Sequence, residues 1–177
     1  MLVTISPEVP NPAVRIKPAT SDQLLDIYRL EQHCFEQPWP YPAFQRQLEA
    51  EAFLVAMEAG ALVGYVVGDL VNGFPGPVGH IKDLAVHPSH RRQGIARRLL
   101  QTALRRLAAS GAVRAQLEVR ESNEGAIALY RSSGFSIDDE RPGYYADGET
   151  ALLMTRRLEP LSSVPSGLTS DSPSRNQ

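Results

Sequence analysis

One glycine in the stretch HRRQGIARRL, residues 90–99, is flanked by arginines on both sides. Gly94 is the glycine, and the arginines are Arg91, Arg92, Arg97 and Arg98. From Gly94 onward the apolar residues recur at helical spacing, which predicts that a helix begins there. A helix N-terminus presents unpaired backbone N–H groups and a positive dipole end, and glycine lets an anion approach closely. The stretch therefore predicts a site for a phosphate or pyrophosphate group.

Two alternative roles for these arginines stay open: a solvated basic helix face, and a nucleic-acid-binding module. A protein that coats nucleic acid is usually basic throughout, whereas this chain has a formal net charge of −2 and an isoelectric point near 6.1. The stretch also lacks the glycine patterns of the Walker loop and of the Rossmann dinucleotide fold.

Three further side chains are candidates for proton transfer. The segment AQLEVR, residues 115–120, alternates between apolar and polar residues, so Glu118 projects opposite its apolar neighbours. Tyr130 lies on the next predicted helix, on a largely buried face, and His80 lies at the start of another strand. A strand glutamate is commonly solvent-facing or salt-bridged, and such a tyrosine is commonly a core residue.

A metal site built from His80, His87 and His90 is conceivable on spacing alone. Pro88 and the strand that carries His80 disfavour convergence of the three rings on one ion. The sequence therefore predicts no metal.

The elements that would position these residues follow from hydrophobic periodicity and turn signals. Their expected order within residues 14–158 is strand, two helices, three strands, helix, strand, helix and two strands, with the second helix over residues 42–50. The strand–helix–strand unit in the second half requires a parallel pair in a mostly antiparallel sheet. The sequence thus predicts one α/β (α+β) domain with a mixed seven-stranded sheet and about four helices. Residues 1–13 and 159–177 are expected to be flexible tails, because they are poor in large apolar side chains.

Composition indicates where such a protein works. Cys34 is the one cysteine, so no intrachain disulfide can form, which suits the reducing cytoplasm. No apolar run approaches the ~20 residues of a membrane span, and the first residues lack the pattern of a signal peptide. A cytoplasmic protein without membrane contact is expected.

Three blocks of the sequence resemble one known family. RRQGIA, residues 91–96, fits the [QR]-x-x-G-x-[GA] signature of the GNAT acyltransferases, and IKDLAVHPSHRRQGIARRLL, residues 81–100, resembles their acetyl-CoA-binding strand, loop and helix. LEVRESNEGAIALYRSSGF, residues 117–135, resembles the protein N-terminal acetyltransferases, including the ribosomal-protein-alanine (RimI-like) branch. GYYADGETALLM, residues 143–154, resembles the closing hairpin of the archaeal form of that branch. The resemblance covers about residues 14–158.

The resemblance implies a GNAT fold whose parallel β-α-β unit binds acetyl-CoA. In the family, the backbone of the loop and helix start holds the pyrophosphate, and the N–H of Val86, on a strand with a β-bulge, faces the thioester. Asn123 is implied to contact the pantetheine arm, although capping of its helix explains it equally well. The implied cofactor-binding residues are Leu84, Ala85, Val86, Arg91, Arg92, Gln93, Gly94, Ile95, Ala96, Arg97, Asn123 and Tyr130.

The same resemblance assigns the acid and base of acetyl transfer. Glu118 is the implied general base, His80 is a second candidate that orders a water, and Tyr130 is the acid that protonates the leaving thiolate. A glutamate has an ordinary pKa of about 4.3, so Glu118 needs either a pKa raised by burial or an intervening water.

For the acceptor, the family uses the loop between its first two helices and the closing hairpin. Here these segments offer aromatic rings, a carboxylate and two hairpin tyrosines: Phe35, Glu36, Trp39, Tyr41, Tyr144 and Tyr145. An α-amine has a pKa of about 7.7–8.0 against about 10.4 for lysine, so more of it is neutral at physiological pH and a modest base suffices. The expected acceptor is a protein or peptide N-terminus, including that of a ribosomal protein, and the expected enzyme is a monomer or weak dimer.

A small amine such as a polyamine or an antibiotic stays open as an alternative acceptor. A polycation would favour an acidic entrance, and the hairpin region carries acidic residues at Asp138, Asp139, Glu140, Asp147 and Glu149.

Overall fold

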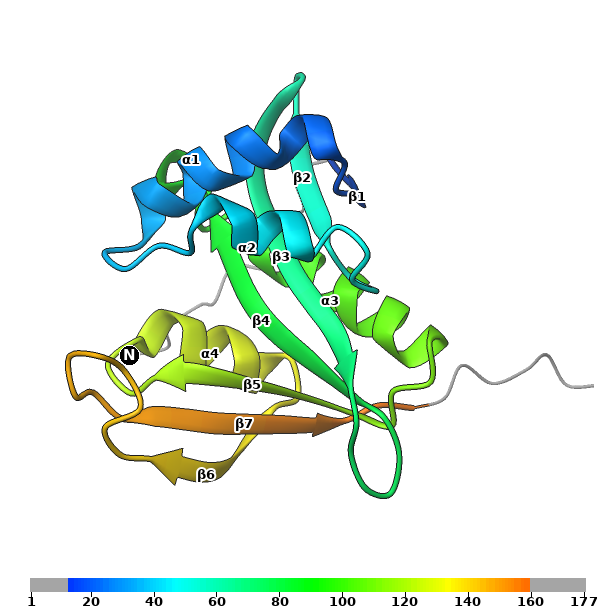
Figure 1. The fold of residues 1–177 in the computed structure, drawn as a ribbon, viewed down its shortest axis with the longest axis vertical. Helices are drawn as coiled ribbons and strands as arrows, with labels where there is room; N and C mark the ends of the chain where they lie inside the picture. Colours follow the sequence, from blue (N-terminus) through cyan, green and yellow to red (C-terminus); the bar gives the residue numbers. More distant parts are fainter. Residues whose placement is uncertain (1–12, 160–177) are drawn as a thin grey trace, which may run out of the picture.

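The computed structural model describes residues 13–159, and within them the chain forms seven strands and four α-helices (Figure 1). The first half contains β1 (Val14–Pro18), α1 (Leu24–Cys34), α2 (Tyr41–Arg46), β2 (Leu54–Glu58), β3 (Ala61–Val71) and β4 (Val78–Val86). The second half contains α3 (Ile95–Ala109), β5 (Arg114–Arg120), α4 (Glu124–Ser132), β6 (Ser136–Arg141) and β7 (Ala151–Arg157). This order confirms the prediction from the sequence. The expected tails, apart from Ala13 and Glu159, lie outside the described residues.

Local signals account for where the helices begin. Thr20 and Gln23 form a capping box before α1, in which the Gln23 side chain accepts the Thr20 N–H at 3.1 Å. Asn123 caps α4 by accepting the N–H of Ala126 at 3.1 Å. Gly94 precedes α3 with a left-handed φ of 75°, which glycine adopts without strain.

Helix α2 is shorter than the sequence predicts. A helix is expected over residues 42–50, whereas α2 ends at Arg46 and the chain then turns. The N–H groups of Ala50 and Phe53 bond to the carbonyls of Gln47 and Ala50, so successive turns lead into β2. The need to return the chain to the sheet overrides local helix propensity here.

The sheet has the strand order β1-β2-β3-β4-β5-β7-β6. Neighbouring strands are antiparallel except β4 and β5, whose parallel pairing confirms the predicted β-α-β unit. That pairing covers only three residue pairs, from Val78–Arg114 to His80–Gln116. Beyond His80 the two strands diverge like the arms of a V (Figure 1). The facing edges of β4 and β5 are therefore not hydrogen-bonded to each other beyond this point.

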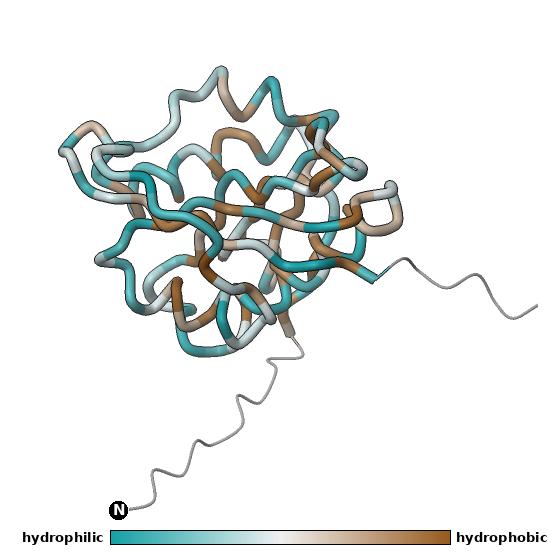
Figure 2. Tube along the Cα trace, turned by 90° about the horizontal axis from the view of Figure 1, so that it is seen from below, coloured by the Kyte–Doolittle hydropathy of each residue, from teal (hydrophilic) through white to brown (hydrophobic). Residues whose placement is uncertain are grey.

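Helices cover both faces of the sheet around β3 and β4. α1 and α2 lie over one face, and α3 crosses the other (Figure 1). Ile27 and Phe44 pack with Tyr65 in the smaller core under α1 and α2, whereas α3 and α4 cover the larger core, which contains Leu99 and Leu117. Figure 2 shows apolar segments running through the interior and hydrophilic segments at the periphery.

The close approach of β3 to β4 gives a test of this packing. A Cβ added at Gly64 would lie 2.9 Å from the Ala85 carbonyl oxygen and 3.2 Å from a methyl group of Leu99. We predict that Gly64→Ala lowers the free energy of unfolding by about 1–3 kcal/mol, because the backbone must move to relieve this contact. Urea unfolding followed by the fluorescence of Trp39 measures the change.

Gly125→Ala is the matched control. Its added methyl group meets nothing within 4 Å, and alanine is the better residue within α4. Its stability should stay equal to that of the wild type or rise. A loss at Gly64 no larger than the change at Gly125 would contradict the described packing.

Candidate active site

His80 and Glu118 meet at the point where β4 and β5 separate. His80 Nε2 lies 2.7 Å from Glu118 Oε2, and Arg141 of β6 donates from Nη1 to Glu118 Oε1 at 3.1 Å. The Glu118 side chain is only 10% exposed, although it lies on the face of β5 opposite the larger core, as the alternation of the strand predicts. Two candidates that lie far apart in the sequence are thus in direct contact.

The surroundings of Glu118 hold the pKa of its carboxyl below the ordinary value. The hydrogen bond from His80 is the main cause, and the charges of His80 and Arg141 add to it and outweigh the opposing effect of burial. Of the two alternatives that the sequence left open for Glu118, this direction disfavours a pKa raised by burial, while an intervening water stays a prediction. Because Glu118 is ionised at neutral pH, His80 Nε2 carries the hydrogen of their contact, and in the neutral form of the ring Nδ1 is then the acceptor.

Tyr130 projects from α4 into the core and is 8% exposed. Burial is the main cause that raises the pKa of its hydroxyl, and the negative charges of Asp83 and Tyr145 raise it further. The hydroxyl stays protonated at neutral pH, which is the state that a proton donor needs.

The loop before α3 has the backbone shape of an anion site. Arg92 and Gly94 both adopt left-handed conformations, with φ of 62° and 75°. α3 has 15 residues, so its first turn, with Ile95 and Ala96, presents several N–H groups without partners within the helix. Left-handed residues beside a helix N-terminus gather successive N–H groups, including that of Gln93, around one concavity. The backbone thus fits the pyrophosphate that the resemblance implies.

The arginine side chains around this loop largely form hydrogen bonds with other parts of the protein. Three guanidinium groups bond within the chain: Arg91 to the Val86 carbonyl oxygen at 3.1 Å, Arg97 to the Ser132 hydroxyl at 3.0 Å, and Arg98 to the Val14 carbonyl oxygen at 2.8 Å. The anion site therefore depends more on backbone N–H groups than on charged side chains. This arrangement also weighs against a nucleic-acid surface, whose arginines contact phosphates directly.

Strand β4 carries a β-bulge, as the resemblance implies. Val67 of β3 pairs with Asp83 and Gly68 pairs with Ile81, so Lys82 is the extra residue. Leu84, Ala85 and Val86 follow the bulge in the segment that has left β5. The contact of the Val86 N–H with a thioester stays a prediction, as does that of Asn123 with a pantetheine arm.

Four predicted acceptor residues lie in the α1–α2 loop and at the first position of α2, two held against the core and two exposed. Trp39 and Tyr41 are half-buried, and their rings pack on aromatic residues of the helices at centroid distances of 5.6 and 5.8 Å. Phe35 is 38% exposed, and Glu36 is also exposed. Phe35 and Glu36 are therefore the accessible members of this set.

Arg120 fixes the loop between β6 and β7. Its Nη1 lies 2.8 Å from Asp147 Oδ2 and 2.7 Å from Glu149 Oε2, and its guanidinium carbon lies 3.9 Å from the centre of the Tyr145 ring. Tyr144 is 49% exposed and packs edge-on against Tyr145. The two hairpin tyrosines thus stay together on an anchored loop.

The contacts of Arg120 also bear on the acidic residues of the hairpin region. Hydrogen bonds from Ser122 are the main cause that lowers the pKa of Glu149 to about 2, and Arg120 lowers it further. Asp147 also shares the Arg120 guanidinium. These two carboxylates are already paired with a cation, which weakens the case for an acidic entrance that attracts polyamines.

The structure also reveals a group that sequence reasoning missed. The Tyr65 hydroxyl of β3 contacts the carboxyl groups of both Glu31 in α1 and Asp83 in β4. One signal could have found Glu31, because it follows Ile27 by four residues on the apolar face of α1. Asp83 and Arg141 carry no such signal, since only the folded sheet brings their partners near.

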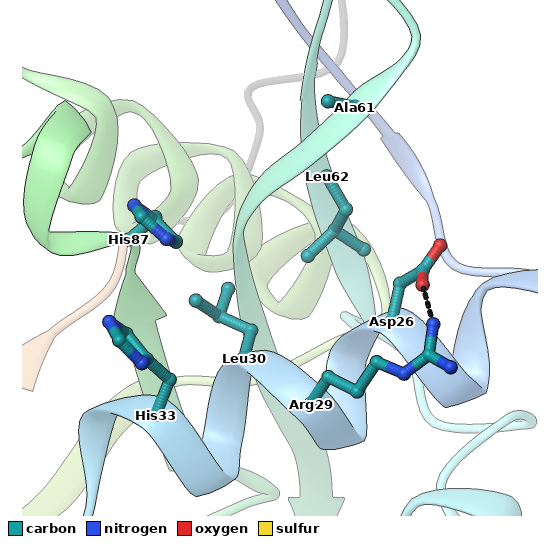
Figure 3. Close-up of a pocket in the computed structure, with 7 residues that line it drawn as sticks. All are labelled: Asp26, Arg29, Leu30, His33, Ala61, Leu62 and His87. Carbon is teal, nitrogen blue, oxygen red and sulfur yellow. Dashed lines mark hydrogen bonds and ion pairs between the residues drawn. The ribbon is translucent and has the colours of Figure 1, made fainter.

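A separate hollow of about 400 Å³ lies between α1, the start of β3 and the residue after β4 (Figure 3). His33 and His87 stack at one end with ring centroids 5.2 Å apart, and Arg29 pairs with Asp26 at the other. Leu30, Ala61 and Leu62 complete the lining. None of the residues predicted for catalysis or acetyl-CoA binding lines this hollow, so it is not part of the candidate site.

The histidines do not form the metal site that their spacing allows. His80 pairs with Glu118, whereas the Ser89 hydroxyl bridges Nδ1 of His87 and Nδ1 of His90. In the described range 13–159, no group of three or more His, Cys, Asp or Glu side chains is arranged to hold a metal ion. Within residues 13–159, no helix has the length and apolar character needed to cross a membrane.

Comparison with known proteins agrees with the resemblance seen in the sequence. The profile of the acetyltransferase (GNAT) family matches residues 24–135. The chain is 38% identical over 148 residues to an N-alpha-acetyltransferase of Saccharolobus solfataricus, covering 77% of this chain and 87% of that protein. It is 41% identical over 136 residues to an uncharacterized protein of Mycobacterium leprae, covering 74% of this chain but only 37% of that longer protein.

A solved structure shares both fold and sequence. The ribosomal-protein-S18-alanine N-acetyltransferase from Escherichia coli superposes with a TM-score of 0.71 at 29% identity. The match covers 89% of this chain and 99% of that one.

The lowered pKa of Glu118 predicts how stability depends on pH. A carboxyl whose pKa is lower in the folded protein stabilises the fold above its ordinary pKa, and this contribution disappears as pH falls through the folded value. We predict that Glu118→Gln is less stable than the wild type at neutral pH, and that the difference shrinks below about pH 4. Urea unfolding of both proteins at neutral pH and below pH 4 measures this difference in stability. Glu121→Gln, at an exposed position, is the control. A difference that is independent of pH would contradict the assigned direction.

The Arg120 cluster predicts a local effect on the β6–β7 loop. Within this loop the Gly148 N–H bonds to the Tyr145 carbonyl at 2.8 Å, so its hydrogen exchange reports on loop order. We predict that Arg120→Gln speeds exchange at Gly148 several-fold, because the loop loses both ion pairs and the contact with the Tyr145 ring. Arg157→Gln, at the exposed end of β7, should leave it unchanged. Equal exchange in both variants would show that Arg120 does not order the loop.

Proposed function

Because the chain belongs to the acetyltransferase (GNAT) family, we propose that it transfers the acetyl group of acetyl-CoA to the N-terminal amine of proteins. The observation that carries the proposal is the His80–Glu118 pair at the point where β4 and β5 separate, with the protonated Tyr130 on the adjoining helix. The names of the Saccharolobus and Escherichia coli enzymes support this choice of acceptor.

Acetyl-CoA binding is assigned to the anion loop and to the edge of β4 that does not pair with β5. The N–H groups from Arg92 to Arg97 would hold the pyrophosphate, because left-handed residues and a helix N-terminus direct them to one side. Residues 84–86 lie on the part of β4 that no longer pairs with β5, so their edge is available to the pantetheine arm and the thioester. When bound, acetyl-CoA supplies the activated acetyl group.

The proposed proton transfers follow from the two protonation states. A C–N bond forms between the amine and the acetyl carbon, and the C–S bond of the thioester breaks. Glu118 stays ionised and fixes the His80 ring by accepting its Nε2–H, so His80 Nδ1 takes the amine proton, directly or through a water. The Tyr130 hydroxyl gives its proton to the departing sulfur. Glu118 thereby acts through His80 and not as a base of raised pKa.

The acceptor is assigned to the side toward which β4 and β5 diverge, where the α1–α2 and β6–β7 loops both lie (Figure 1). Phe35 and Glu36 would contact the first residues from one loop, and Tyr144 and Tyr145 from the other. An N-terminal amine is appreciably neutral at physiological pH, which suits an unexceptional base. We propose N-termini beginning with Ala, Ser or Met as acceptors, the alanine of a ribosomal protein among them, and a cytoplasmic location in which Cys34 stays reduced.

Thiol release from acetyl-CoA tests the choice of acceptor. Peptides that begin with Ala, Ser, Met or Met-Glu are compared with internal-lysine peptides blocked at the N-terminus and with spermidine. We predict that at least one N-terminal class reacts much faster than lysine or spermidine. A lysine peptide or spermidine that reacts as fast would overturn the assignment.

Variants test the assigned roles. We predict that Glu118→Gln, His80→Gln and Tyr130→Phe each lower kcat by about 10²–10⁴-fold while acetyl-CoA affinity is retained. Glu118→Gln combined with His80→Gln should be little slower than either single variant, because the two residues act as one unit. Glu121→Gln serves as the control. Multiplicative losses in the double variant would show that Glu118 and His80 act independently.

A further inference from the structure

A carboxyl–phenol–carboxyl cluster lies beneath the α1–α2 loop. It consists of Glu31 in α1, Tyr65 in β3 and Asp83 in β4. Glu31 and Tyr65 are 1% and 0% exposed, and Asp83 is half-buried with its carboxyl group deep among these side chains. Tyr65 Oη lies 2.7 Å from Asp83 Oδ2 and also contacts Glu31 Oε2. Two acids thus meet at one hydroxyl group.

The contacts require one proton more than the phenol supplies. Backbone N–H groups occupy the outer carboxyl oxygens, from Trp39 to Glu31 Oε1 at 2.7 Å and from Leu84 to Asp83 Oδ1 at 2.8 Å. The single hydrogen of Tyr65 can be donated to only one of the two inner oxygens. The second contact is a hydrogen bond only if a carboxyl group carries a proton.

The electrostatic surroundings favour this extra proton. Burial is the main cause that raises the pKa of Asp83 to about 8, and the nearby charge of Glu31 raises it further. The other titratable groups that face the pair are Cys34 of α1 and Tyr130 of α4, while Lys82 on β4 is bonded to Gln47 and Asp69. The cluster therefore carries one negative charge at neutral pH and two under alkaline conditions.

The cluster joins two parts of the candidate site. Through Glu31 it holds the backbone of Trp39, in the loop that the proposed function assigns to the acceptor. Through Asp83 it holds β4 at its bulge, directly before the residues assigned to the thioester. A second negative charge would replace the hydrogen bond between Tyr65 and one carboxyl group by repulsion between the two acids.

We propose that Glu31, Tyr65 and Asp83 are positioning residues whose shared carboxyl proton holds the α1–α2 loop against β4 in the arrangement that accepts the N-terminus. Loss of this proton loosens the loop. The role in acceptor binding depends on the proposed function, whereas the shared proton and its effect on the loop do not.

Trp39 provides a direct probe, because it is the single tryptophan of the sequence and its backbone N–H donates to Glu31 Oε1. We expect its fluorescence in the full chain to change in one step centred near pH 8. Asp83→Asn should abolish that step, since an amide NH₂ can donate to Tyr65 at every pH while its oxygen still accepts from Leu84. The step should persist in Asp69→Asn, a matched loss of a carboxylate that bonds Lys82, and in Cys34→Ser, which removes the nearby thiol.

Stability gives a second readout that needs no substrate. A carboxyl whose pKa is raised by folding destabilises the folded protein progressively as pH rises from its ordinary pKa to the raised value. The urea midpoint of the wild type should therefore fall between about pH 4 and pH 8 relative to that of Asp83→Asn, which lacks this titration, and the difference should stay constant above about pH 8. A wild-type fluorescence that stays flat, or a step that survives in Asp83→Asn, would overturn the shared proton.

Acceptor kinetics test the positioning role separately. The acceptor amine titrates in the same range, so wild type and Asp83→Asn are compared at each pH with one peptide. The two KM values for peptide should agree at neutral pH, and that of the wild type should be several-fold higher under alkaline conditions, with equal KM for acetyl-CoA throughout. If the fluorescence step is present but the KM values stay equal, the cluster does not position the acceptor loop. If no acceptor is acetylated at all, the proposed function fails while the fluorescence result still stands.

Discussion

The short parallel pairing of β4 with β5 is the constraint on which the site depends. Three residue pairs hold the strands together, and His80 is the last paired residue of β4. From there β4 follows β3 and β5 follows β7, so the facing edges of β4 and β5 are not paired with each other. Had the pairing continued, backbone hydrogen bonds between the strands would occupy the edge to which the proposed function assigns the pantetheine arm. The separation also places the His80–Glu118 contact at the point where the two strands part.

Two carboxyl groups, one on β4 and one on β5, are driven to opposite protonation states. Glu118 accepts hydrogen bonds from His80 and Arg141, so its pKa falls and it stays ionised. Asp83 is enclosed and faces a second acid, so its pKa rises and the cluster keeps a proton. The first state suits an anchor for a histidine that accepts a proton, and the second suits a neutral link between a loop and a strand. The surroundings of each carboxyl group, and not its residue type, decide that Glu118 is ionised and that Asp83 shares a proton.

The sequence predicts the elements well because their signals are local. The capping box of Thr20 and Gln23, the glycine before α3 and the alternation around Glu118 each involve residues within one turn or strand. The end of α2 is missed because the path back to the sheet decides it. The partners of Glu118 and the Glu31–Tyr65–Asp83 cluster are also missed, since they join residues that only the register of the sheet brings together. For the same reason the sequence cannot give the direction of the Glu118 pKa shift.

The central proposal is that acetyl-CoA binds between the diverging parts of β4 and β5 and at the anion loop before α3. Amide hydrogen exchange with and without acetyl-CoA tests this claim most directly, because it resolves the backbone N–H groups themselves. We predict slower exchange at residues 84–86 and 92–97, with no change in β1 or around His33. Protection confined to the hollow lined by His33 and His87, or absent from residues 92–97, would contradict it.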